Sequence, residues 1–310
     1  MNFLKLLKDT AKSWDKNDPW AQSATIAYYA LFSIPSLSII TVYVAGIFLG
    51  REAVQGKVTQ EIGGLIGRDS AKAIEEMISN AALEQSSTFA IIIGVSILIF
   101  GATGVFFQLQ KALNKVWSVH AKKASFKTTL KKRATSFGVI LAIGLLLLIS
   151  LLLSAVISAF SDVIASYYSE ASNTVVEVLN FLITEFFIWS LFATIYTVLP
   201  DVQLKWKTTL LGALVASLLF LVGKYALSFY FSKADPGSVY GAAGSVVIIL
   251  LWVYYTCLIL FFGAEFIKNW ALLKGIKVKP TSNATFYFEK ELEEYETYKK
   301  NVDDRNTPKE

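Results

Sequence analysis

The sequence predicts an all-α, polytopic helical membrane protein with six transmembrane helices and both termini in the cytoplasm. Of its 310 residues, 54% are hydrophobic and only 17% are charged, whereas about a quarter of the residues in a soluble domain are charged. The apolar residues also gather in long blocks. A helix needs about 20 apolar residues to cross about 30 Å of hydrocarbon. Six runs meet this requirement: 27–49, 88–109, 137–160, 178–199, 208–231 and 244–267.

The distribution of lysine and arginine orients these six runs. Of the 29 Lys and Arg residues, 23 fall in the segments that alternate on one side of the predicted membrane, and five fall in the segments on the other side. Basic residues near the ends of transmembrane helices stay in the cytoplasm. The side with 23 is therefore predicted to be cytoplasmic, and the same residues are expected to meet anionic lipid headgroups.

Three parts follow from this topology. They are an amphipathic cytoplasmic segment at 1–26, a transmembrane domain at 27–267 with an outer helical insertion at 51–87, and a charged cytoplasmic tail at 268–310. The insertion has the spacing of two short amphipathic helices, which are expected either to cap the outer mouth or to serve as inert packing.

The N-terminal segment places four apolar residues on one helical stripe: Leu4, Leu7, Ala11 and Trp14. A helix of this kind suits the surface of the inner leaflet, which we expect, but a helix docked on the protein has the same pattern. Asp18 and Pro19 then predict a turn towards the first span.

The fifth run contains Lys224, and the fourth contains Glu185. Each lies seven residues from the predicted outer end of its run, about 10 Å deep at 1.5 Å per residue, so consecutive antiparallel helices would place the opposite charges at matching depth. An unpaired charge at this depth costs at least about 2.5 kcal/mol. Three interpretations stay open: a solvated functional cavity, a structural ion pair, and a lysine that extends outward to the interface.

Other features of the runs suggest helix breaks and close packing. Pro35 interrupts the first run and frees a backbone carbonyl. Small residues permit close helix contact or an unwound entry to a span; the positions concerned are Gly101, Gly104, Gly241 and Gly244. Glu265 completes the candidate charged site. It lies at the inner end of the sixth run, where we expect its carboxylate to reach water.

The chain lacks the residues that several classes of protein function require. The chain has a single histidine, His120, and a single cysteine, Cys257, which together cannot build a His/Cys metal site or an internal disulfide. There is no P-loop signature. The basic run 120–133 contains a single aromatic residue, Phe126, so we expect no nucleic-acid partner. No cofactor, no metal and no catalytic residue are predicted.

Four motifs resemble the YihY/BrkB family of bacterial inner-membrane proteins, once labelled ribonuclease BN-like. They are ATIAYYALFSIPSL, GATGVFFQLQKALNKVW, YTVLPDVQLKWKTTLLGALVASLLFLVGKYALSFYF and YGAAGSVVIILLWVYYTCLILFFGAE, in this order between residues 20 and 270. The resemblance implies six spans, a place in the bacterial inner membrane and a proposed transport role. Of the residues named above, the resemblance also implies Pro35, Gly101, Gly104, Lys224, Gly241, Gly244 and Glu265, whereas the role of Glu185 rests on its depth alone. The further motif positions that it implies are Tyr28, Tyr29, Asn114, Trp117, Leu199, Pro200, Trp206, Gly212, Tyr225, Tyr240, Trp252, Tyr254, Tyr255 and Gly263.

The predicted function is therefore that of an inner-membrane transporter or permease for an ion, a small solute or a lipid, with its charged site between the fourth and fifth spans. The alternative is a non-transporting membrane scaffold for envelope integrity, which would recruit envelope proteins as partners. Membrane lipids are partners in either case. We expect no ribonuclease activity, because metal-dependent hydrolysis needs clustered His, Asp and Glu.

Overall fold

A computed structural model describes residues 3–33, 72–73, 75–76, 88–122, 171–234, 239–240 and 243–288. The predicted third span at 137–160, most of the first span including Pro35, nearly all of the insertion at 51–87, Gly241, and the tail beyond residue 288 lie outside these residues. The helices are α1 (Phe3–Lys16), a second helix over residues 19–33, α5 (Thr88–Val116), α7 (Ala171–Val198), α8 (Trp206–Ala234) and α10 (Gly244–Leu273).

Three of these helices have stretches long and apolar enough to cross a membrane. They are Phe181–Val198 within α7, Trp206–Ala234 and Gly244–Leu273. Each coincides with one of the runs predicted from sequence, and α5 covers a fourth. At 1.5 Å per residue, the 30 residues of α10 reach about 45 Å, which exceeds the hydrocarbon core. The mostly helical fold and these three candidate spans are therefore present as predicted.

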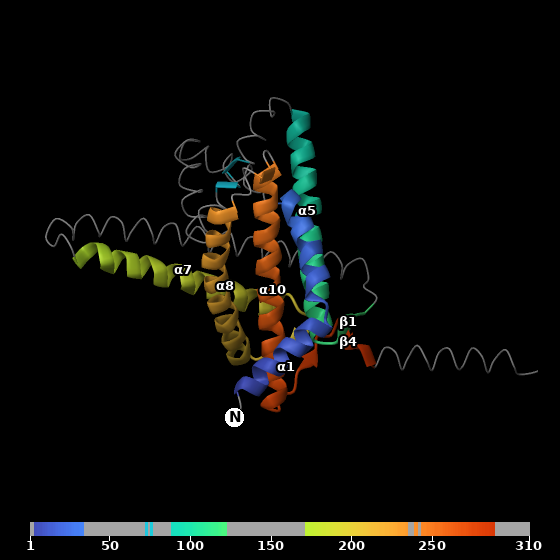
Figure 1. Ribbon diagram of the computed structural model, residues 1–310. Helices are drawn as coiled ribbons and strands as arrows, with labels where there is room; N and C mark the ends of the chain where they lie inside the picture. The colour runs from blue at the N-terminus through green and yellow to red at the C-terminus, as the bar shows by residue number, and fades with distance from the viewer. Residues whose placement is uncertain are drawn as a thin grey trace, which may run out of the picture.

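α10 is the central helix of the described bundle. It contacts α8, α1 and α5, and Figure 1 shows it between α8 and α5. Helix 19–33 runs beside α5, and α1 crosses the lower end of α10 in that view. We call this end of the bundle the α1 end.

The direction of α7 differs from the prediction. Consecutive antiparallel spans would place α7 alongside α8, but α7 runs across the direction of α8 and α10 and leads away from the bundle (Figure 1). Its C-terminal half makes the contact, since the indole nitrogen of Trp189 donates a hydrogen bond to the carbonyl oxygen of Leu210 at 2.9 Å. The sequence pattern predicted a long apolar helix here but not its direction, because the direction depends on side chains that pack against α8 and α10.

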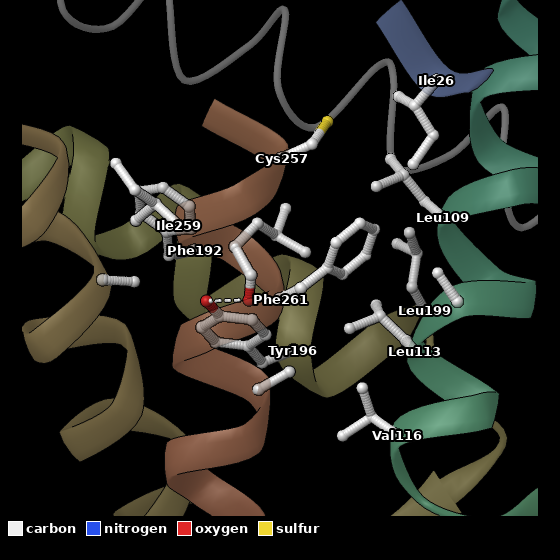
Figure 2. Packing of buried hydrophobic residues seen from close by; sticks show 14 of the residues in the cluster. Ile26, Leu109, Leu113, Val116, Phe192, Tyr196, Leu199, Cys257, Ile259 and Phe261 are labelled. Atoms are coloured by element: carbon white, nitrogen blue, oxygen red, sulfur yellow. Dashed lines mark hydrogen bonds between the residues drawn. The ribbon is translucent and has the colours of Figure 1, made fainter. Parts of the chain in front are cut away.

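Apolar side chains from α5, α7 and α10 meet in one core. Figure 2 shows Phe261 of α10 directed towards Leu113 of α5. In the same view the buried hydroxyl of Tyr196 donates a hydrogen bond to the carbonyl oxygen of Leu260 at 2.8 Å. A buried phenol needs such an acceptor, so this bond ties the end of α7 to α10.

Two short antiparallel ladders were not predicted. β1 (Val119–Ala121) pairs with β4 (Ala284–Phe286), and β2 (Val202–Gln203) pairs with β3 (Lys279–Pro280). Together they bind the segment after α10 to the loops that follow α5 and α7, so residues 279–286 are not a free tail. Strands of two or three residues are too short to show a period of two in the sequence.

Gly275 ends α10. Its φ angle is +63°, a conformation that glycine adopts without steric cost. The N–H of Gly275 donates a hydrogen bond to the carbonyl oxygen of Leu272, and the N–H of Ile276 donates to the carbonyl oxygen of Ala271. These two hydrogen bonds form a Schellman motif. The chain can therefore turn directly into the segment that forms β3 and β4.

Candidate functional site

Glu185 of α7 and Lys224 of α8 interact electrostatically. Both side chains are half-buried, and each charge influences the other. The neighbouring Gly223 lies against the ring of Tyr255, where an added Cβ would come within 1.8 Å of a ring carbon. The absence of a side chain there brings α8 and α10 together just beside Lys224.

We expected Glu185 and Lys224 to meet because they lie at the same depth on two antiparallel helices. The structure differs from this expectation, because α7 crosses α8 instead of running antiparallel to it. The two charges meet through the crossing of the helices and the reach of their side chains. Their proximity thus depends on the tertiary arrangement. Counting residues from the ends of the two runs predicted this proximity from a helix geometry that the structure does not have.

Glu265 lies apart from this pair. It is ten residues beyond Tyr255 on α10, about 15 Å along the helix axis at 1.5 Å per residue. It belongs to a separate group at the α1 end, which we call the Glu265 junction and define as Glu265, Asn17, Lys115 and Lys268. The predicted charged site is therefore two sites in the described structure.

The Glu265 junction joins three helices. The amide nitrogen of Asn17, in the turn after α1, donates to Oε1 of Glu265. Lys115 of α5 donates to the backbone carbonyl of Asn17 at 2.8 Å. Lys268 Nζ lies 3.9 Å from Glu265 Oε2. One turn of chain is thus held by a carboxylate on one side and by an ammonium group on the other.

The expectation that Glu265 reaches water is wrong. The residue is 0% exposed, although it is only eight positions from the end of α10. The reason is tertiary: α1 docks across α10, with the indole of Trp14 bonded to the carbonyl oxygen of Leu258 and the amide of Asn269 bonded to Ser13. A helix end that looks solvent-accessible in sequence is covered by a segment some 250 residues earlier.

A small cavity of about 10 Å³ adjoins the carboxylate, enough for about one water molecule. It is lined by Trp14, Asn17, Pro19, Gln22, Ala112, Val116, Phe261 and Glu265. Within the described part of the chain, Glu265 Oε2 is buried and accepts no hydrogen bond. A buried carboxylate oxygen without a donor is costly, so this position is a candidate for a bound species.

Asn114 and Asp201 form a second buried polar group at the α1 end. The amide of Asn114 donates to Asp201 Oδ2 at 2.8 Å, and its oxygen accepts from the backbone N–H of Asp201 at the same distance. Gln110 adds a longer bond of 3.2 Å to Oδ2. The loop after α7, in which Pro200 is buried, is thereby fixed to α5.

Two glycines of α5, Gly101 and Gly104, lie where this helix approaches helix 19–33. A Cβ at Gly101 would lie 3.0 Å from the backbone oxygen of Tyr29, and one at Gly104 would overlap the Tyr29 ring. On α8 and α10, Gly212 and Gly263 lie against Ile267 and the Tyr196 hydroxyl. Gly244 is buried at the start of α10.

The remaining motif residues are spread over the bundle. Trp117 is buried, and Trp252, Tyr254 and Tyr255 are half-buried on α10. Trp252 packs edge-on against Phe220, with ring centroids 6.1 Å apart. The exposed aromatic motif residues are Tyr28, Trp206, Tyr225 and Tyr240.

Sequence reasoning missed Asn17, Lys115 and Asp201 as parts of these groups. Asp201 follows a proline in the third motif, and Asn17 precedes the predicted Asp18-Pro19 turn. Polar residues beside turns are common, so neither position carries a signal on its own. Their partners are 87 and 248 residues away in the chain.

The comparisons with known proteins agree with the motifs. The model of the virulence factor BrkB family matches residues 10–279, which include both polar groups and the Glu185–Lys224 pair. The chain belongs to this family. The resemblance carried by the four motifs is thereby confirmed.

Curated relatives of this BrkB-family chain are membrane proteins by name. The chain is 24% identical over 244 residues to a UPF0761 membrane protein of Pseudoalteromonas atlantica, with 77% of each chain covered. It is 26% identical over 296 residues to a UPF0761 membrane protein of Photobacterium profundum, with 89% of this chain and 88% of the relative covered. No solved structure matches the chain. With its long apolar helices, this BrkB-family chain is a membrane protein.

Proposed function

We propose that this protein is a transporter or permease of the bacterial cytoplasmic membrane, with both termini inside, that moves an ion, a small solute or a lipid. The observation that carries the proposal is the interaction of Glu185 with Lys224, each of which lies within a long, mainly apolar stretch of its helix. Ionisable side chains within apolar spans are costly, and they commonly mark the path of a polar cargo.

A binding role accounts for this pair better than a purely structural one. Ion pairs taken out of water add little net stability compared with apolar side chains of similar volume. Both side chains are half-buried, so each keeps part of its surface open to a cargo. A positive and a negative group at one place suit a cargo that carries a charge or a strong dipole.

Hydrolysis of RNA is not part of the proposal. Metal-dependent nucleases hold their ions with clustered carboxylates and histidines. The whole chain has one histidine, and the residues that the structure describes include no group of three His, Cys, Asp or Glu side chains suited to a metal ion.

Reconstitution into liposomes tests the proposal. Proton flux, sodium flux and the scrambling of a fluorescent lipid would be followed in one preparation, with wild type beside Lys224→Met/Glu185→Gln. We expect wild type to move at least one cargo and the folded double variant to lose that movement at least tenfold. Lys233→Met, an exposed lysine near the end of the same helix, is the matched control and should retain the movement.

A different result would favour the scaffold alternative. If neither protein moves a cargo, or if the double variant moves it as fast as wild type, the result favours a structural contact, and transport of the tested cargoes through the pair is excluded. Capture of envelope proteins by the full-length chain in native membranes would then be the next measurement.

A further inference from the structure

We propose that Glu265 is a proton-binding site, separate from the Glu185–Lys224 pair, and that its protonation loosens the hold of α10 on the turn after α1. Proton binding itself does not depend on the transport function proposed above. Its use as a coupling ion would rest on that function.

The surroundings of Glu265 favour a proton over a metal ion. Lys268 Nζ lies 3.9 Å from Oε2, and Lys115 is bonded to the carbonyl of Asn17. A metal ion would add a further positive charge beside two ammonium groups, and it would need several oxygen ligands. The cavity of about 10 Å³ has room for about one water molecule.

No carboxylate competes for the proton among the groups described around Glu265. The cations are Lys268 from its own helix and Lys115 from α5. α1 and the following turn contribute the neutral Ser13 and Asn17, and helix 19–33 contributes Gln22 to the cavity. From α8, Gly212 faces Ile267 of α10. The charges of α1 at Asp9, Lys12, Asp15 and Lys16 are exposed.

The proton would arrive through the cavity. Asn17 and Gln22, which line it, are only half-buried, so a water in the cavity can exchange protons with solvent. In the uptake step, a hydronium ion transfers its proton to Oε2 and leaves a neutral water. One O–H bond forms and one breaks, and nothing is oxidised or reduced. The new hydroxyl then donates to the cavity water, which supplies Oε2 with the hydrogen bond that it lacks in the described structure.

Protonation changes the strength of the contact with α1. The bond from Asn17 to Oε1 is charge-assisted while Glu265 is ionised, and such bonds are about twice as strong as neutral ones. The attraction between Lys268 and Oε2 also disappears on protonation. The ionised carboxylate therefore holds the turn after α1 more firmly than the neutral acid does.

Infrared difference spectroscopy tests the proton site directly. Spectra of the full chain in liposomes at several pH values would reveal the carbonyl band of a buried carboxylic acid. We expect wild type to show a band that titrates, Glu265→Gln to lose it and Glu185→Gln to keep it. A titrating band that Glu265→Gln leaves unchanged, or no titrating band in wild type, would overturn the proposal.

Spin labels test the movement of α1. Lys5→Cys on α1 and Lys122→Cys after β1 are exposed positions for labels, in a Cys257→Ser background. We expect the distance distribution to broaden at low pH in wild type, and Glu265→Gln to show the broad distribution at every pH. A pH response that survives in Glu265→Gln would contradict the proposed coupling.

A second variant covers a failure of Glu265→Gln to fold. Lys268→Met removes the cation beside Oε2 at a partly exposed position, and we expect it to shift the pH midpoint of the band upward by about one unit, since about 1.4 kcal/mol corresponds to one pH unit. An unshifted midpoint would contradict the assignment to Glu265.

If cargo moves in liposomes but no band titrates, the proton site is wrong while transport stands. If the band titrates but no cargo moves, the proton site stands and the proposed transport is contradicted.

Discussion

Individual polar residues determine how the loops at the α1 end are held, and Asn114 is the clearest example. Its side chain both donates to the carboxylate of Asp201 and accepts from the backbone N–H of the same residue. Both residues are buried. Since a buried polar group must find a partner within the protein, this reciprocal pairing fixes the loop between α7 and α8.

We expect Asn114→Ala to lower the free energy of unfolding by about 2 to 3 kcal/mol, because it leaves a buried carboxylate and a buried N–H each short of one partner. Unfolding in mixed detergent micelles would measure the change. Gln110→Ala is the control, with an expected loss below about 1 kcal/mol, since its bond of 3.2 Å is longer and half-buried. Equal losses in the two variants would show that the reciprocal pairing is unimportant.

At the scale of whole elements, α1 shows how one amphipathic helix can be docked on the protein along one face and keep apolar residues exposed on another. The apolar stripe that the sequence places on this helix is Leu4, Leu7, Ala11 and Trp14, and in the structure Leu4 is 76% exposed and Ala11 is exposed as well. The buried positions of α1 are Leu6 and Thr10. The helix therefore docks on α10 through a face that joins Leu6 and Thr10 to Trp14, and its outer apolar edge at Phe3 and Leu4 remains available to lipid.

We expect Leu6→Ala to weaken the docking of α1 by about 2 to 3 kcal/mol, because Leu6 is only 2% exposed and its loss leaves a cavity. The accessibility of a cysteine at the buried position Thr10 to maleimide, in the Cys257→Ser background, reports the docking. Leu4→Ala is the matched control and should leave the labelling rate unchanged. Faster labelling in Leu4→Ala than in Leu6→Ala would mean that the other stripe is the docked one.

At the scale of the whole molecule, the described segments give the bundle two distinct ends. The α1 end carries α1, both β ladders and the C-terminus of α10, whereas Val239 and Tyr240 precede the opposite end of α10. Exposed lysines at the first end include Lys12 in α1, Lys205 after β2 and Lys279 in β3. Since basic residues near span ends favour the cytoplasmic side, we expect this end to face the cytoplasm.

We expect cysteines at Lys12 and Asn283 to lie on the cytoplasmic side, and a cysteine at Tyr240 to lie on the outer side. All three positions are exposed. A membrane-impermeant thiol reagent applied to spheroplasts, again in the Cys257→Ser background, should label Tyr240→Cys at once and the other two only after lysis. Labelling of Lys12→Cys and Asn283→Cys from opposite sides would contradict both the topology and the placement of α1 and the β ladders at one end of the bundle.

The sequence by itself determined the class of the protein and the positions of its long helices. Membrane spans depend on the number of consecutive apolar residues, a local property, so the runs at 208–231 and 244–267 coincide with α8 and α10. The turn at Asp18 and Pro19 was equally local: α1 ends at Lys16 and the next helix begins at Pro19. Family membership followed from motifs that are contiguous in the chain.

Only the tertiary structure decided which polar residues meet. Glu265 is buried because α1 covers it, Asp201 is held by a residue of α5, and Glu185 comes near Lys224 through helices that cross. The short ladders likewise depend on partners more than 70 residues apart. Such contacts join segments that are distant in the chain, and their energies depend on geometry that no local pattern of hydrophobicity or charge encodes.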